Sequence, residues 1–188
     1  MSETTRILRE EHDNILRGLE ILEACAPKLL DGQPVPPETM EGLIEFFRLY
    51  ADRTHHGKEE DLLFPAMIAN GFSREVGPIH CMLADHENNR ALTRQMIDAA
   101  ARYRSGDQKA GITFGSAATE YVRVLREHIQ KENLVLFVMA DDAIPSQDQP
   151  ALLEKFHDVD ENKIGAAEIN RLLALRDRLA EQFLVEAQ

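Results

Sequence analysis

Cysteine is scarce in this sequence, and a long apolar run is absent. Of the 188 residues only two are cysteines, Cys25 and Cys81, and they form no Cys-x-x-Cys pair. This usage excludes a disulfide scaffold and is typical of reduced thiols, so we expect both to be small core residues. No apolar segment approaches the roughly 18 residues needed to cross a bilayer, and residues 1–6 lack the apolar centre of a signal peptide. We therefore predict a cytoplasmic protein without a membrane partner.

Basic residues are also few. Lys and Arg number 21 against 33 Asp and Glu, which gives a formal net charge of -12. A chain of this sign is a poor partner for phosphates, so we exclude nucleic acid as a partner and regard cations as the more natural ligands. The rest of the composition, 44% hydrophobic and 29% charged, is that of an ordinary globular domain. The seven histidines of this acidic chain are therefore the residues to follow.

The sequence lacks the period-two alternation of β-strands. Apolar residues recur instead at helical spacing, as at Ile15, Leu19 and Leu22. Pro and Gly mark the loops, most clearly within residues 31–37. We predict helices over residues 4–30, 37–69, 74–105, 108–142, 149–157 and 165–185. This pattern indicates an all-α fold, with an up-down-up-down four-helix bundle over residues 1–145. The additional C-terminal helices, residues 146–188, are expected to pack on the bundle or to mediate association into a homo-oligomer.

Two parts of the chain repeat each other. Residues 55–64 (HHGKEEDLLF) match residues 128–137 (HIQKENLVLF) without a gap, and both contain His-x-x-Lys-Glu followed by Glu or Asn. The corresponding residues are His55 and His128, Glu59 and Glu132, both 73 positions apart, and His12 and His86, 74 apart. The first and the second helix pair therefore look like copies of one helical hairpin. Each copy carries one early histidine and one later His-x-x-x-Glu.

These repeated residues meet at one level of the predicted bundle. Each of the four histidines lies roughly 18–20 residues from the loop of its own hairpin, which places all of them about 27–30 Å from the same end. His and Glu at positions i and i+4 share a helix face, so each hairpin directs two imidazoles and one carboxylate at the bundle axis. The predicted metal ligands are His12, His55, Glu59, His86, His128 and Glu132.

Spacing alone leaves open whether the first copy uses positions 55 and 59 or positions 56 and 60. The repeat aligns His55 with His128. One turn before His55 stands Ala51, whereas Asp52 stands one turn before His56. We therefore expect the His56 side chain either to contact a metal ligand without binding the metal itself or to face solvent.

Four imidazoles and two carboxylates form a ligand set for transition metals. The repeat supplies one ion per hairpin, bridged by Glu59 and Glu132, and a binuclear site rich in nitrogen and oxygen favours iron over zinc. The Glu-x-x-His motif of ferritin-like bundles is absent at His12, His86 and His128, and His-Glu-x-x-His of metalloproteases does not occur. We predict two iron ions.

The same segments resemble the hemerythrin-like (HHE cation-binding) family. The resemblance covers about residues 4–142 and rests on residues 55–65, 77–87 and 128–133. It implies a non-heme diiron centre in a four-helix bundle, with the six predicted residues as ligands and the two glutamates bridging. Oxygen-carrying hemerythrins have a further histidine one turn from the third-helix ligand, where this sequence has Met82 and Arg90. That departure implies an open or water-filled coordination position beside His86.

The open position predicts a protein that binds or senses a small diatomic ligand, oxygen or nitric oxide. Arg90 beside the position argues against reversible oxygen carriage, because a polar pocket admits water and anions. Two alternatives stay open. One is an enzyme-like role in iron-sulfur cluster repair or in reactions with nitric oxide or peroxide, and the other is an iron-storage module.

Overall fold

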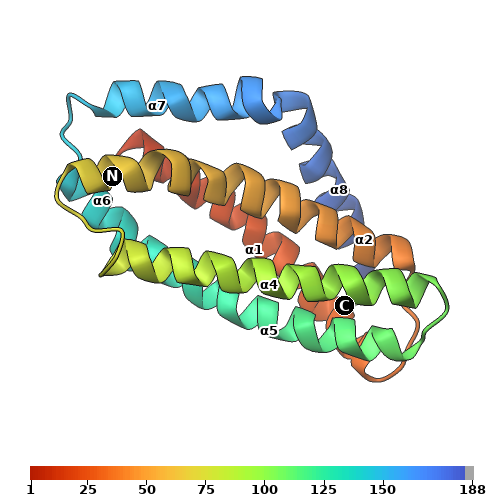
Figure 1. The fold of residues 1–188 in the computed structure, drawn as a ribbon. Coiled ribbons are helices and arrows are strands. Elements are labelled where there is room, and N and C mark those ends of the chain that lie inside the picture. The colour runs from red at the N-terminus through yellow and green to blue at the C-terminus, as the bar shows by residue number, and fades with distance from the viewer. Residues whose placement is uncertain (185–188) are drawn as a thin grey trace.

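The computed structural model describes residues 1–184, and every regular element in this part of the chain is a helix. Four long helices lie side by side, consecutive ones running in opposite directions, and a shorter helical segment follows (Figure 1). The first long helix is α1 (Glu3–Leu30), and the second consists of α2 (Pro37–Phe46), η1 (Phe47–His56), η2 (Glu59–Leu63) and α3 (Phe64–Ala69). The third is α4 (Pro78–Arg104), and the fourth consists of α5 (Lys109–Lys131), η3 (Glu132–Leu136) and α6 (Phe137–Ala143). The C-terminal segment consists of α7 (Gln149–Asp158), η4 (Val159–Ile164) and α8 (Ala166–Leu184). The prediction of an all-α helical bundle is confirmed.

Local chemistry explains where these helices begin. The Ser2 side chain accepts a hydrogen bond from the Thr5 backbone N–H and caps α1. The sequence predicts that the third helix begins at residue 74, but in the structure it begins at Pro78. The reason is Gly77, which has a φ of 81°. A residue in this left-handed region cannot continue an α-helix, whereas proline suits the first turn of a new one.

The segments labelled η are π-helical, with i→i+5 hydrogen bonds and a wider turn than an α-helix. Two of them begin at the repeated glutamates, η2 at Glu59 and η3 at Glu132. The internal repeat therefore extends from the residue pattern to an irregularity of the backbone. π-Helical turns inside α-helices often occur at functional sites.

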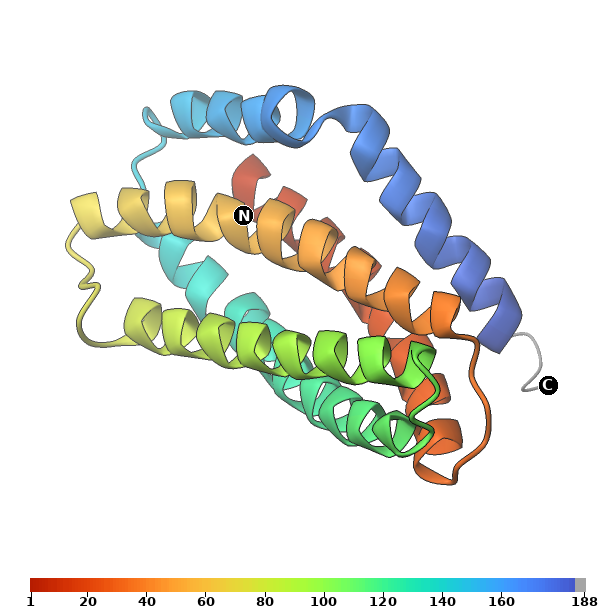
Figure 2. The ribbon, with the colours of Figure 1, turned by 45° about the vertical axis from the view of Figure 1, so that its right-hand side comes forward.

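The packing leaves a polar layer between two apolar clusters. One cluster includes Leu19, Phe47 and Tyr121, and the other includes Phe64 and Phe137 nearer the opposite end of the bundle. The predicted ligands occupy the intervening positions on each long helix. The C-terminal segment covers the side formed by α1 and α2, as the two views of the ribbon show (Figures 1 and 2).

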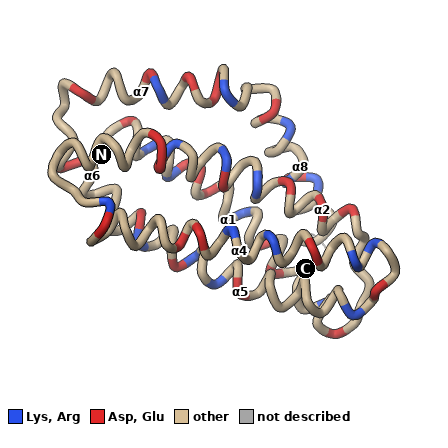
Figure 3. The backbone as a smooth tube through the Cα atoms, viewed as in Figure 1, with Lys and Arg blue, Asp and Glu red and all other residues tan. Residues whose placement is uncertain are grey.

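The surface carries both signs of charge. Acidic and basic residues are interspersed along the helices (Figure 3), and many of the ion pairs link residues of the same helix one turn apart. Among residues 1–184, none of the helices has the length and apolar character needed to cross a membrane. The two cysteines differ: Cys25 is buried as expected, but Cys81 is exposed, so its predicted place in the core is wrong.

Candidate metal centre

The structure brings all six predicted ligands together in the polar layer, and it adds a seventh residue, His56. Each of the seven side chains is at most 1% exposed. They come from all four long helices: His12 from α1, the adjacent His55 and His56 with Glu59 from the second helix, His86 from α4, and His128 with Glu132 from the fourth. His56 therefore does not face solvent.

The seven residues form two groups of potential ligand atoms, each within 4.8 Å of one another. The groups are His12, His55, Glu59 and Glu132, and His56, Glu59, His86 and His128. Glu59 belongs to both groups. This arrangement suits two neighbouring ions rather than one.

Both glutamates lie between the groups. The Glu132 Oε2 atom is 3.1 Å from Nε2 of His12 and 3.2 Å from Nε2 of His128. Glu59 also reaches both groups, but with one oxygen for each. Its Oε1 atom is 3.6 Å from Nε2 of His55, and its Oε2 atom is 3.5 Å from Nε2 of His86. Each carboxylate thus reaches one histidine of each group, as a carboxylate bridging two ions would.

A second ring of side chains orients the imidazoles. Every one of the five histidines has an oxygen acceptor at its outer nitrogen, Nδ1. The acceptors are Asn133 for His12 (3.0 Å), Glu11 for His55 (3.0 Å), Asp52 for His56 (3.4 Å), Glu60 for His86 (2.7 Å) and Asp85 for His128 (3.4 Å). A proton donated outward from Nδ1 leaves the Nε2 lone pair directed inward, the form in which histidine binds a metal.

This outer ring follows the internal repeat. Glu11 and Asp85 each precede the early histidine of their hairpin and each accept from the later one. Lys58 donates to Glu11, and Lys131 donates to Asp85. Each hairpin therefore holds its later histidine by the same lysine–carboxylate pair, which explains the lysine of the repeated His-x-x-Lys-Glu pattern.

The residues that follow Glu59 and Glu132 also have a common role. Glu60 and Asn133 each accept a hydrogen bond from the early histidine of the opposite hairpin. Sequence reasoning missed this ring, although the repeat itself contained the signal. His56 and Asp52 have no counterpart, because Leu125 and Ile129 occupy the corresponding positions. The second group thus receives a third histidine that the repeat does not supply.

The two lysines differ in their surroundings. Lys58 is fully buried and also donates to Asp160 of η4 at 2.8 Å, whereas the side chain of Lys131 is 48% exposed. The C-terminal segment therefore contacts the outer ring of the centre on one side only, through Asp160, Lys58 and Glu11.

Burial and neighbouring charges shift the pKa values of the inner residues. Burial lowers the pKa of His55 and of His86, and it lowers the pKa of His56 to about 3. These imidazoles are neutral at pH 7 and can act as ligands. Burial opposes protonation of His128 too, but the Glu132 and Asp85 carboxylates outweigh it and raise its pKa to about 9.

The two glutamates cannot both carry charge easily in this layer. Burial and then the charge of Glu132 raise the pKa of Glu59 well above its usual range. Burial acts on Glu132 in the same direction, but His128 and His12 outweigh it and hold its pKa well below the usual range. Two cations between these carboxylates would remove the repulsion.

The atoms that face the middle of the layer fit such ions. Nε2 of His55, Nε2 of His56, both oxygens of Glu59 and Oε1 of Glu132 are buried and have no hydrogen-bond partner among the described residues. Orphaned buried polar atoms are rare and costly. Here they are all nitrogen and carboxylate ligand atoms, which is the donor set that iron accepts.

A family model for the hemerythrin HHE cation-binding domain matches residues 3–140. The chain belongs to this family. The match covers all seven residues of the layer, and it confirms the resemblance inferred from the repeated motifs. Hemerythrin-like domains of this kind bind cations, so metal binding follows from the family as well as from the geometry.

The chain is also similar to the uncharacterized proteins Mb2018 of Mycobacterium bovis and Rv1995 of Mycobacterium tuberculosis. Each is 22% identical over 160 residues, which is 85% of this chain. The chain spans 62% of the length of these curated relatives. No solved structure matches it.

Within the hemerythrin-like domain, His56 changes the interpretation of the third helix. Its ring stacks on that of His86, with centroids 3.9 Å apart. It therefore occupies the neighbourhood in which the sequence predicted an open position. Arg90 is engaged as well: its guanidinium pairs with Asp52 at 2.8 Å and with Glu60 at 2.6 Å.

Proposed function

We propose that this hemerythrin-like domain holds two iron ions and binds a small diatomic ligand at one of them. The observation that carries the proposal is the pairing of five inward-directed histidines with two shared glutamates. His56, His86 and His128 would hold one ion, and His12 and His55 would hold the other. Glu59 and Glu132 would bridge them.

The unequal division of the histidines determines where a ligand binds. One ion has three imidazoles and two shared carboxylates, and the other has two imidazoles and the same carboxylates. We therefore assign the open position to the ion held by His12 and His55. The sequence predicts the open coordination position beside His86 and Arg90 instead.

The surroundings of the open position favour a small uncharged ligand. The ring of Phe137 stacks on His12 with centroids 5.4 Å apart, and Leu8 is fully buried in the same apolar cluster as Phe137. Apolar walls limit the access of water to a metal site and control its reactivity. Iron supplies the affinity for oxygen or nitric oxide, and the chain supplies oriented imidazoles, bridging carboxylates and a dry layer.

Iron loading followed by spectroscopy tests this function. We expect elemental analysis of the iron-loaded chain to give about two irons per chain and Mössbauer spectra to show two unequal sites. Azide added to the oxidised protein, or nitric oxide added to the reduced protein, is expected to shift the signal of one site only. The exposed His80 provides a control, since His80→Ala is expected to change none of these results.

Three results would contradict the proposal. A single tightly bound zinc would exclude the binuclear centre, and iron well above two per chain would point to storage. Two irons that respond to neither azide nor nitric oxide would show that both ions are saturated by the protein.

A further inference from the structure

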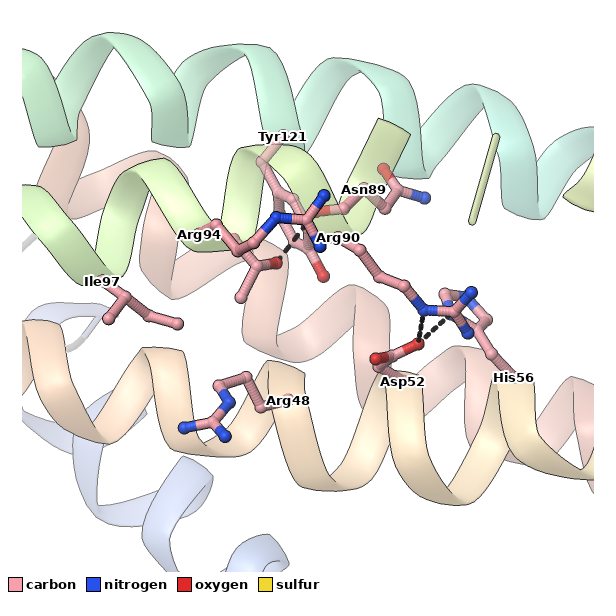
Figure 4. Close-up of a pocket in the computed structure, with 9 residues that line it drawn as sticks. Arg48, Asp52, His56, Asn89, Arg90, Arg94, Ile97 and Tyr121 are labelled. Atoms are coloured by element: carbon pink, nitrogen blue, oxygen red, sulfur yellow. Dashed lines mark hydrogen bonds and ion pairs between the residues drawn. The ribbon is translucent and has the colours of Figure 1, made fainter. Parts of the chain in front are cut away.

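A cavity of about 170 Å³ lies beside the metal centre, between α4 and the η1 part of the second helix (Figure 4). His56 and Asp52 line it from η1, Asn89, Arg90 and Arg94 line it from α4, and Tyr121 lines it from α5. An engineered protein cavity of roughly 150 Å³ accommodates benzene, so this space is large enough for a small organic molecule.

The cavity is positively charged in a chain whose net charge is -12. Three arginines line it, Arg48, Arg90 and Arg94, against a single carboxylate, Asp52. Arg90 is neutralised by its ion pairs with Asp52 and Glu60. Arg48 and Arg94 reach the cavity from opposite helices and make no ion pair or hydrogen bond with any residue from 1 to 184 (Figure 4). Two positive charges are thus available to an anion.

A second, independent feature is the side chain of Asn89. This residue is only 3% exposed, and neither its amide nitrogen nor its amide oxygen has a hydrogen-bond partner among the described residues. Leaving a buried polar group without a partner is energetically costly. A bound molecule that offers both an acceptor and a donor would satisfy it.

Part of the remaining lining is apolar. Beside Thr93, the side chain of Ile97 and the ring of the buried Tyr121 line the cavity. A purely inorganic anion would leave this surface in contact with water or empty space, whereas a hydrocarbon group would cover it. The lining therefore combines positively charged side chains that can bind an anion, a buried polar side chain and an apolar surface.

We propose that this cavity binds a small organic carboxylate. Arg48 and Arg94 hold the carboxylate, Asn89 pairs with a further polar group, and the hydrocarbon part lies against Ile97 and Tyr121. His56 forms part of the wall, and it belongs to the group of potential metal ligands with Glu59, His86 and His128. The occupant therefore lies next to a proposed iron ligand. This last consequence rests on the proposed function, but binding of the carboxylate does not.

Calorimetric titration of the iron-loaded chain with benzoate tests the proposal, with benzamide as an uncharged molecule of the same shape. Benzoate is expected to bind more tightly than benzamide, which has the same ring and a polar group for Asn89 but no charge for the arginines. The double variant Arg48→Ala/Arg94→Ala is expected to bind benzoate about tenfold more weakly, since it loses two exposed charge pairs with the ligand. The matched control is Arg123→Ala, an exposed arginine of α5 that does not line the cavity, which is expected to change nothing.

Four results would overturn the carboxylate site. They are no binding of benzoate, equal binding of benzamide, equal binding by the double variant, and tighter binding of inorganic phosphate than of benzoate. A metal-free sample separates the two proposals. Benzoate binding that persists there supports the cavity, and binding that disappears with the metal shows that iron itself was the site. Absence of iron in a chain that binds benzoate would contradict the metal centre alone.

Discussion

His56 shows how a single residue can be misjudged from its neighbours. The sequence placed it outside the centre because Asp52, a charged residue, stands one turn before it. In the structure Asp52 is the acceptor for Nδ1 of His56, and the imidazole is buried against His86. A carboxylate one turn from a histidine therefore allows two interpretations. Either both residues lie on a solvated helix face, or the carboxylate is the outer hydrogen-bond partner of a histidine that binds a metal. Here Asp52 binds both His56 and Arg90, which fits the second interpretation.

Replacing His56 tests this role directly. His56→Ala removes one of three imidazoles from one ion, so we expect bound iron to fall from about two to about one per chain. His80→Ala is the matched control, because His80 is exposed and lies outside the layer. If the His56 variant retains both irons with unchanged spectra, His56 only supports other ligands.

The lowered histidine pKa values predict how the metal-free protein responds to acid. His55, His56 and His86 have pKa values below about 6.5 in the folded state, so below that pH the unfolded chain binds more protons. Glu11, Glu59 and His128, whose pKa values are raised, act in the opposite direction, but the effect of His128 fades once this histidine is protonated in the unfolded chain as well. The three histidines therefore dominate below about pH 6, where the free energy of unfolding should decrease by about 1–2 kcal/mol per pH unit as pH falls.

Thermal melts of the chelated protein between pH 6 and pH 5 measure this effect. A melting temperature that rises as the pH falls over this interval would show that the histidines are not buried together in the neutral form.

At the scale of the elements, the repeat makes two equivalent lysine–carboxylate pairs that differ in their surroundings. Lys58 is enclosed by η4 and bound by Glu11 and Asp160, whereas Lys131 lies at the surface beside Asp85. Breaking a buried pair leaves an uncompensated charge, but an exposed pair contributes little. The C-terminal segment should therefore stabilise one hairpin much more than the other.

A matched pair of substitutions tests this difference. Lys58→Met is expected to lower the free energy of unfolding by about 3–5 kcal/mol, because Glu11 and Asp160 then lose their cation. Lys131→Met is expected to cost at most about 1 kcal/mol. Urea denaturation of both variants gives the comparison, and equal losses would mean that η4 does not enclose Lys58.

At the scale of the whole molecule, the proposed metal centre would join all four long helices at one level. Ions that bind only the folded state add stability by mass action, about 4 kcal/mol when the free metal exceeds its dissociation constant a thousandfold. For a chain of this size that corresponds to roughly 10 °C in melting temperature. We therefore expect chelation at pH 7 to lower the melting temperature by about this amount. Identical melting curves with and without metal would place the ions elsewhere.

Much of this architecture could be predicted from the sequence, because helical periodicity and loop residues are local signals. The ungapped repeat also brought His12, His55, Glu59, His86, His128 and Glu132 to one level. The inclusion of His56 could not be predicted from regular helix spacing. The second helix is π-helical through Phe47–His56, so the α-helical register used to assign faces does not hold there. The contact between Asp160 and Lys58 joins residues 102 positions apart and left no local pattern.

The central claim is that two ions share Glu59 and Glu132 and divide five histidines three to two. Crystals of the iron-loaded chain, with diffraction data collected at the iron absorption edge, test it most directly. We expect two anomalous peaks in the buried layer. One should lie within bonding distance of Nε2 of His56, His86 and His128, and the other within bonding distance of Nε2 of His12 and His55. A single peak, or two peaks with His56 bound to neither, would contradict it.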